Sequence, residues 1–160
     1  MVTNDDGPAQ RLAEDVVALM RAHDRFSAWL GLEVVALSPH SCTVRAPIRE
    51  DMLNGFGICH GGVTFALADS ALAFASNTHG LLTMSVENGI SYVARVDAGD
   101  VLTATATEAE AGGPLAFYRV EVRNQRDRCV ALFRGTVYRT KKPLTRAGST
   151  PALSPAPDSA

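Results

Sequence analysis

The segment from residue 55 to residue 80 constrains the fold more than any other part of the sequence. From Val63 to Ala75 almost every residue is apolar or small, and alanine and leucine favour a helix. Gly61 and Gly62 open this helix and Gly80 closes it. Apolar residues fall on all its sides, so we expect the helix to be buried all round.

One charged residue, Asp69, stands inside this apolar helix. A lone buried carboxylate is costly unless hydrogen-bond donors satisfy it or chemistry uses it. The start of the same helix favours use in chemistry, because the first backbone N–H groups lack partners and carry partial positive charge. A glycine there, Gly61, lets a substrate approach the backbone closely. This arrangement is typical of an oxyanion hole for acyl transfer.

The spacing of Gly61 and Asp69 predicts how such a site is assembled. The two residues are eight positions apart, which is about 12 Å along a helix that rises about 1.5 Å per residue. They cannot both touch one carbonyl group. If both serve one reaction, the helix start of one subunit must face Asp69 of another, which predicts two identical sites at a two-fold dimer interface.

Three further residues precede the helix, and each has two readings. His60 either shapes the loop through hydrogen bonds or acts as a general base. Asn54 is either a turn residue or a donor to a substrate carbonyl. Cys59 is a small packed hydrophobe or a nucleophile, and we favour packing because adjacent side chains rarely form a Cys–His pair.

Composition narrows the possible functions. The chain has 160 residues, enough for one domain with a real core, and its formal charge of −2 gives no reason to expect nucleic acid as a partner. No apolar run is long enough to cross a bilayer, and the polar, acidic N-terminus is not that of a signal peptide. Three cysteines, an odd number, indicate a reduced cytoplasmic protein. The remaining histidines have no metal-ligand spacing, so we expect no metal site.

The rest of the chain predicts short helices followed by antiparallel strands. We expect disorder over 1–9 and over the Pro/Ser/Ala-rich tail 143–160, with a single domain over 10–142 between them. The expected elements are a helix over 10–21, a short helix capped by Asp24, a hairpin of strands 33–37 and 41–48, the helix 61–78, and strands 82–93, 101–110, 116–124 and 129–139. Short turns between consecutive strands make an antiparallel sheet. The expected fold is α+β, with a curved antiparallel sheet wrapped around the long helix.

The stretch from Leu53 to Gly62, followed by Leu67-Ala68-Asp69, closely resembles the hotdog-fold thioesterases of the phenylacetic acid degradation group, the PaaI type. The segments 98–102 and 130–135 are similar to later strands of that family. The resemblance covers about residues 26–140. It implies a hotdog fold, a dimer that usually pairs into a homotetramer, and no metal.

The resemblance also implies an activity and places residues in it. The reaction is hydrolysis of acyl-CoA, commonly aromatic acyl groups such as phenylacetyl or hydroxyphenylacetyl, with coenzyme A as part of the substrate and no other cofactor. The family's catalytic carboxylate falls on Asp69 and its oxyanion-hole glycine on Gly61. The amide that contacts the carbonyl falls on Asn54, and the motif histidine falls on His60.

The sequence departs from the family after the strand that follows the long helix. Family members often carry an Arg-Pro pair there, whereas residues 92–96 lack proline and place Arg95 one position away. Arg95, Arg119 and Arg123, with Lys141, are candidates to meet the phosphates of coenzyme A. The alternative for each is a solvated charged surface.

Two other functions stay open at this point. A hotdog hydratase would move a proton at carbon, which usually requires a histidine working with a carboxylate across the interface. A non-catalytic acyl-CoA sensor would lack the carboxylate or carry a DNA-binding domain. Asp69 is present, and the N-terminal segment is too short and insufficiently basic for such a domain.

Overall fold

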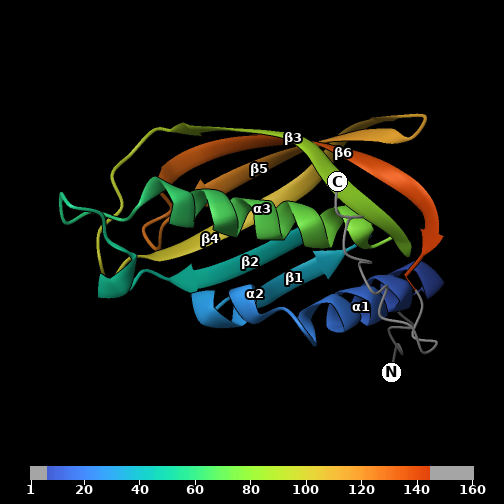
Figure 1. Ribbon diagram of the computed structural model, residues 1–160, viewed down its shortest axis with the longest axis horizontal. Coiled ribbons are helices and arrows are strands. Elements are labelled where there is room, and N and C mark those ends of the chain that lie inside the picture. The colour runs from blue at the N-terminus through green and yellow to red at the C-terminus, as the bar shows by residue number, and fades with distance from the viewer. Residues whose placement is uncertain (1–6, 145–160) are drawn as a thin grey trace, which may run out of the picture.

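The computed structural model describes residues 7–144, and Figure 1 shows one long helix lying across a sheet. The elements in that range are α1 Pro8–Arg21, α2 Arg25–Leu30, β1 Glu33–Ser38, β2 Ser41–Pro47, a 3₁₀ turn Glu50–Met52, α3 Gly61–Asn77, β3 Leu81–Tyr92, β4 Val101–Gly112, β5 Leu115–Arg123 and β6 Cys129–Pro143. This order confirms the predicted α+β fold.

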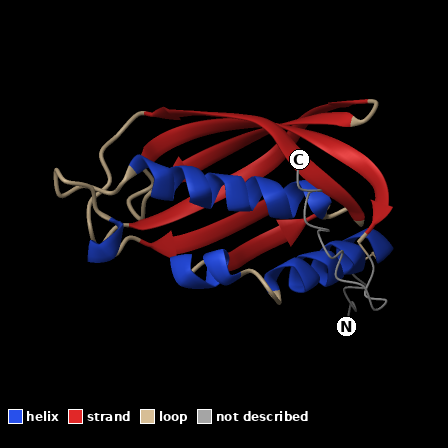
Figure 2. Cartoon of the chain, in the orientation of Figure 1, coloured by secondary structure: helices blue, strands red, loops and turns tan. Residues whose placement is uncertain are grey.

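The six strands form one antiparallel sheet in the order β1-β2-β4-β5-β6-β3. Figure 2 shows the sheet curving around α3, as predicted. The strand β3, which follows α3 directly, does not pair with the next strand in sequence. It pairs with β6 at the far end of the sheet and forms one of the two edges.

The core lies between α3 and the concave face of the sheet. Alternation in β4 and β5 separates buried from exposed positions, as the period of two requires. In β4 two neighbouring inward positions, Ala104 and Ala106, are small and fully buried. In β5 the neighbouring inward positions Tyr118 and Val120 are large and buried. Small side chains on one strand let the helix approach closely while large ones fill the space beside it.

Both ends of α3 are held by specific hydrogen bonds. His60 caps the first turn, since its Nδ1 accepts a 2.9 Å hydrogen bond from the Gly62 N–H. At the other end Asn77 bonds twice to Thr83 of β3, donating to its carbonyl oxygen and accepting from its N–H. Gly80 makes the turn between them with φ of +82°, a conformation that favours glycine. These contacts set the position of β3 against α3.

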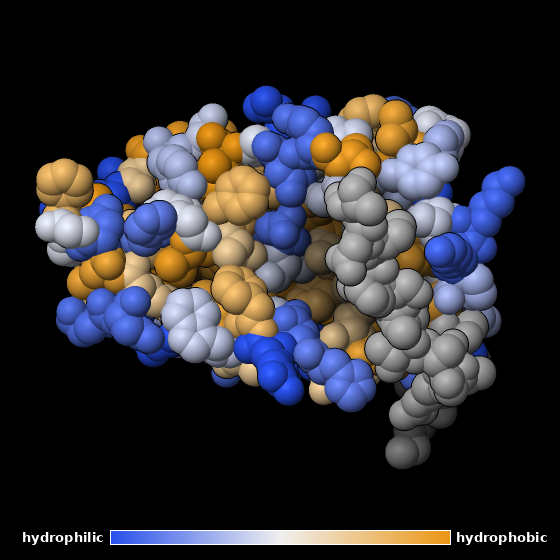
Figure 3. Space-filling view, viewed as in Figure 1, coloured by the Kyte–Doolittle hydropathy of each residue, from blue (hydrophilic) through white to orange (hydrophobic). Residues whose placement is uncertain are grey.

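The expectation that α3 is buried all round is wrong for the single chain. The sheet covers only one side of the helix, and the other side stays partly or fully exposed. We call this side the open face of α3; it comprises Gly62, Ala66, Asp69, Ser70 and Ala73. In Figure 3 apolar side chains in the region of this helix are interspersed with hydrophilic ones.

The ends of the described chain differ slightly from the expected boundaries. The first helix begins at Pro8, not at Gln10, because proline is well suited to the first helical position. The last strand extends to Pro143, and the N–H of Leu144 bonds to the carbonyl oxygen of Gly80. The remaining parts of the expected disordered segments, 1–6 and 145–160, lie outside the described residues. None of the helices within 7–144 has the length and apolar character needed to span a membrane.

Candidate active site

The first turn of α3, Gly61 and Gly62, forms what we call the helix mouth. His60 lies outside it as the cap and occupies the Gly62 N–H, and its carbonyl oxygen accepts from the Val63 N–H. Within the described chain nothing accepts a hydrogen bond from the Gly61 N–H. The geometry therefore supports a structural role for His60 as the helix cap. The backbone N–H of Gly61 remains available to donate a hydrogen bond to a substrate.

A cavity of about 210 Å³ lies beside the helix mouth. Its lining combines polar and apolar residues: Asn54, Ile58, Cys59, Gly61, Thr64, Tyr92, Ala94, Arg95, Val96 and Val130. Three predicted site residues, Asn54, Gly61 and Arg95, thus meet at one cavity. Two others, His60 and Asp69, do not line it.

Asn54 forms a turn and keeps its side-chain NH₂ group available as a hydrogen-bond donor. Its Oδ1 accepts a 2.9 Å hydrogen bond from the Phe56 N–H, and its backbone N–H donates to the carbonyl oxygen of Ile58. These bonds fold the loop back toward the helix mouth. The amide nitrogen Nδ2 has no hydrogen-bond acceptor among residues 7–144, so both readings of Asn54 are compatible with the geometry.

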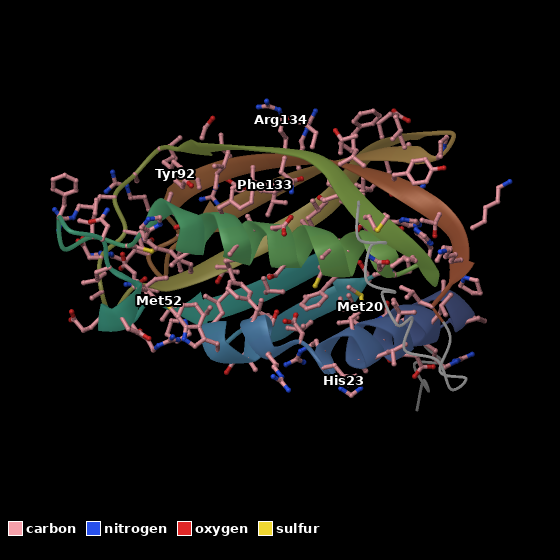
Figure 4. All side chains as sticks on the ribbon, in the orientation of Figure 1. Met20, His23, Met52, Tyr92, Phe133 and Arg134 are labelled. Atoms are coloured by element: carbon pink, nitrogen blue, oxygen red, sulfur yellow. The ribbon has the colours of Figure 1, made fainter. Side chains whose placement is uncertain are left out.

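Tyr92, at the end of β3, packs directly on the helix mouth. Its hydroxyl donates a 2.8 Å hydrogen bond to the carbonyl oxygen of Gly61. A Cβ at position 61 would lie 3.0 Å from the Tyr92 ring and hydroxyl. Figure 4 shows Tyr92 beside the first turn of α3. A side chain on residue 61 would therefore crowd this tyrosine as well as the cavity.

Cys59 also lines the cavity, but as a neutral thiol. Burial raises the pKa of Cys59 and is the largest effect; the hydrogen bond with the Thr64 hydroxyl lowers the pKa, and the Asp100 carboxylate makes a smaller contribution that raises it. A thiol is nucleophilic only as its thiolate. The packing interpretation of Cys59 therefore fits the structure better than the nucleophilic one.

Asp69 lies on the open face of α3, two turns beyond the helix mouth. Its carboxylate accepts a 2.8 Å hydrogen bond from the side-chain amide of Asn88 on β3. Burial raises the pKa of Asp69, and the Asn88 hydrogen bond acts in the opposite direction. Among residues 7–144 the donor to this carboxylate is a side-chain amide and not a backbone or Ser/Thr group, and both the structural and the catalytic interpretation of Asp69 are compatible with this geometry.

The three arginines suggested for coenzyme A do not form one group within a single chain. Arg95 lies at the cavity, with its guanidinium paired to Asp97 at 2.5 Å. Arg119 and Arg123 project from β5 on the sheet face away from α3. Arg123 is engaged by Glu121 at 2.6 Å, whereas Arg119 faces Arg134 across the strand pair. Lys141 is exposed near the end of β6.

Sequence reasoning missed two residues of this region, Asn88 and Tyr92. Both lie on β3 and point toward α3, where apolar side chains are the rule. A polar residue at an inward strand position next to a helix with one charge was the available signal for Asn88. No comparable signal marked Tyr92, because its contact with Gly61 depends on how β3 is placed at the sheet edge.

Known proteins share this sequence and architecture. The family model of the thioesterase superfamily matches residues 56–131. The acyl-coenzyme A thioesterase PaaI of Escherichia coli is 36% identical over 126 residues, which are 79% of this chain and 90% of that protein. The structure of the E. coli PaaI protein from the phenylacetic acid degradation operon matches with a TM-score of 0.83 and 34% identity, covering 86% of this chain and 99% of that one.

A more distant match was solved with a ligand. The Streptococcus mutans protein smu.793, bound to acetyl CoA, has a TM-score of 0.67 and 25% identity, covering 70% of this chain and 90% of that one. The sequence matches and the curved sheet around α3 both indicate the same family. The chain therefore belongs to the thioesterase superfamily, as a PaaI-type thioesterase with the hotdog fold.

Proposed function

We propose that this protein hydrolyses acyl-CoA thioesters to the free acid and coenzyme A. The observation that carries the proposal is the pair of donors at the cavity. The Gly61 N–H and the Asn54 amide both border the same space and both lack an acceptor among the described residues. Two such donors suit the oxygen of a thioester carbonyl as it gains negative charge in the transition state.

The chemistry follows from these groups and from Asp69. The carbonyl oxygen accepts hydrogen bonds from Gly61 and Asn54, and the positive end of α3 stabilises its developing charge. Asp69 then either attacks the carbonyl carbon or removes a proton from an attacking water. In both routes the C–S bond breaks and coenzyme A leaves as its thiolate. In the first route the acyl group remains on Asp69 as a mixed anhydride, which a water then hydrolyses to the free acid and the Asp69 carboxylate. Single turnover in oxygen-18 water, followed by a search for label in Asp69, distinguishes the two routes.

We assign the two halves of the site to two subunits. Asp69 is absent from the lining of the cavity that holds Gly61, and it lies on the open face of α3. The edge strand β3 also exposes the apolar side chains of Met84 and Val86. A second copy that covers the open face and this edge would bury both features and bring its own Asp69 to the cavity.

We further propose that the substrate carries an aromatic acyl group, that the protein is a homotetramer and that it is cytoplasmic. The phenylacetic acid degradation context of the E. coli relative supports aromatic acyl-CoA substrates. Exposed apolar residues on the outer sheet face, Phe117 and Tyr138, support pairing of dimers into a homotetramer. Arg95 lines the cavity, which supports a role for it in binding a phosphate of coenzyme A. Three unpaired cysteines support a cytoplasmic location.

A panel of acyl-CoA substrates with a thiol reagent tests this function. The panel contains phenylacetyl-CoA, hydroxyphenylacetyl-CoA, a saturated straight-chain acyl-CoA and an enoyl-CoA. Thiol release that is fastest with the aromatic members is the expected result. A changed acyl chain without thiol release would indicate a hydratase, and binding without either change would indicate a sensor.

A further inference from the structure

The carboxylate of Asp69 has a single protein partner within residues 7–144. The side-chain amide nitrogen of Asn88 donates to its Oδ1 at 2.8 Å. Asn88 comes from β3, the edge strand, so the bond joins the helix to the strand that would lie nearest to a second subunit. One carboxylate oxygen is thereby occupied, and the other, Oδ2, has no partner in the described chain.

Ser85 supports the orientation of the Asn88 amide from the side away from Asp69. The ionised carboxylate of Asp69 can only accept, so the NH₂ group of Asn88 must point to it, and the Ser85 hydroxyl then donates to Oδ1 of the same amide at 3.0 Å. Residues 85 and 88 are three positions apart, so a regular strand would place them on opposite faces. A register shift between Ser85 and Glu87 brings them to the same side.

The neighbouring strand leaves room for this arrangement. Gly135 of β6 is the direct cross-strand partner of Asn88. A Cβ at position 135 would lie 2.8 Å from Oδ1 of Asn88 and 2.4 Å from a methyl carbon of Leu72 on α3. Any other residue there would therefore displace the Asn88 amide, the Leu72 side chain or both. The position of the Asn88 amide thus depends on three features, which are the bulge in β3, Gly135 in β6 and Ser85.

We propose that Asn88 is a positioning residue that orients the Asp69 carboxylate, with Ser85 supporting the amide and Gly135 making room for it. This inference rests on the proposed function of Asp69. In the bound geometry Oδ1 is held by Asn88, and Oδ2 is the oxygen that faces the reacting thioester or water. The hydrogen bond also stabilises the ionised carboxylate against the effect of burial.

The Asn88 hydrogen bond is the one interaction within residues 7–144 that favours the ionised form of Asp69. Burial raises the pKa of Asp69 and the Asn88 bond lowers it, and no charged side chain of the described residues contributes to the shift. Hydrogen bonds to charged groups are strong enough to move a pKa by about one unit or more. Loss of the amide should therefore move the protonation of Asp69 toward neutral pH.

The test compares Asn88→Ala, Asn88→Asp and Ser85→Ala with wild type over a range of pH. For Asn88→Ala we expect the acid limb of the kcat/KM profile to move to higher pH by about one unit. At pH values below this limb kcat should fall by at least about tenfold relative to wild type. KM should change little. Asn88→Asp should move the limb further, because two adjacent carboxylates share a proton. Ser85→Ala should give a smaller shift in the same direction. Thr107→Ala, an exposed change on the outer face of β4, is the matched control.

Two results would overturn the inference. One is an unchanged acid limb and kcat in folded Asn88→Ala protein. The other is a loss of kcat that is equal at every pH, which would mean a structural role alone. Titration of the Asp69 carboxyl by carbon-detected NMR reads the same shift without turnover. If wild type hydrolyses no thioester, the proposed function fails, but the NMR comparison of wild type with Asn88→Ala still decides whether Asn88 controls Asp69.

Discussion

The hydroxyl of Tyr92 donates a 2.8 Å hydrogen bond to the carbonyl oxygen of Gly61, which ties the end of β3 to the first turn of α3. From the other side His60 caps the same turn through the Gly62 N–H. The backbone that carries the proposed oxyanion donor is thus held in place before any substrate arrives. Such preorganised donors stabilise a transition state without reorganisation at the moment of reaction.

Replacing Gly61 with alanine should disturb this contact in a measurable way. The new Cβ would lie 3.0 Å from the Tyr92 ring, so the ring or the helix mouth must shift. We expect kcat/KM of Gly61→Ala to fall by at least about tenfold. In a Tyr92→Ala background the same substitution should cost less, because the crowding partner is gone. Equal losses in both backgrounds, measured as a double-mutant cycle, would contradict the role of Tyr92.

Asn54→Asp separates the two roles of Asn54. Aspartate keeps an Oδ1 that can accept from the Phe56 N–H, so the turn should persist. It removes the Nδ2 donor and places negative charge near the developing oxyanion. Turnover should fall by about a hundredfold or more, while the thermal midpoint stays close to that of wild type. Near-normal turnover in this variant would leave Asn54 with its turn role alone.

Asp69→Asn should lose activity without losing stability. Turnover should fall by at least about a hundredfold if Asp69 is a base or nucleophile. Because burial raises the pKa of Asp69, the folded state disfavours the charged carboxylate at neutral pH. Asparagine can still accept from Asn88, so the thermal midpoint at neutral pH should be equal to or higher than that of wild type. A folded variant with full turnover would return Asp69 to a structural role.

His79, which lies just after the C-terminal end of α3, should make the stability of the fold depend on pH. Burial, with Arg139 and His40 nearby, lowers the pKa of His79 from its usual 6.5, against smaller opposite effects of a backbone hydrogen bond and of Glu108. The unfolded chain then binds a proton before the folded chain does. The contribution of His79 is therefore complete above the unfolded pKa and is lost as pH falls toward the folded value.

His79→Asn is the variant that isolates this effect. Its side-chain oxygen can replace Nδ1 as acceptor of the Leu81 N–H, and it does not titrate. Between about pH 7.5 and about pH 5, the thermal midpoint of wild type should fall more than that of the variant. Parallel curves for the two proteins would show that His79 does not contribute to the pH dependence.

The fold was largely predictable because its pattern is local. The alternation in β4 and β5 and the apolar run of α3 follow directly from the sequence, and Asp69 stands out as a misfit in that run. The exposure of α3 on one side was not predictable, because a helical pattern does not say how much of the helix a sheet will cover. The Asn88–Asp69 bond depends on the pairing of β3 with β6 and on a bulge, which are both tertiary features.

The shared site is the central claim, and mixed dimers test it most directly. Asp69→Asn removes the carboxylate, and Gly61→Val should block approach to the backbone donor, so each homodimer should be inactive. Unfolding the two mutants together and refolding them gives about half heterodimers if assembly is random, and each heterodimer has one intact site of two. The account predicts recovery of about a quarter of wild-type activity. If both mutants fold and exchange subunits but no activity returns, Gly61 and Asp69 do not share a site across the interface.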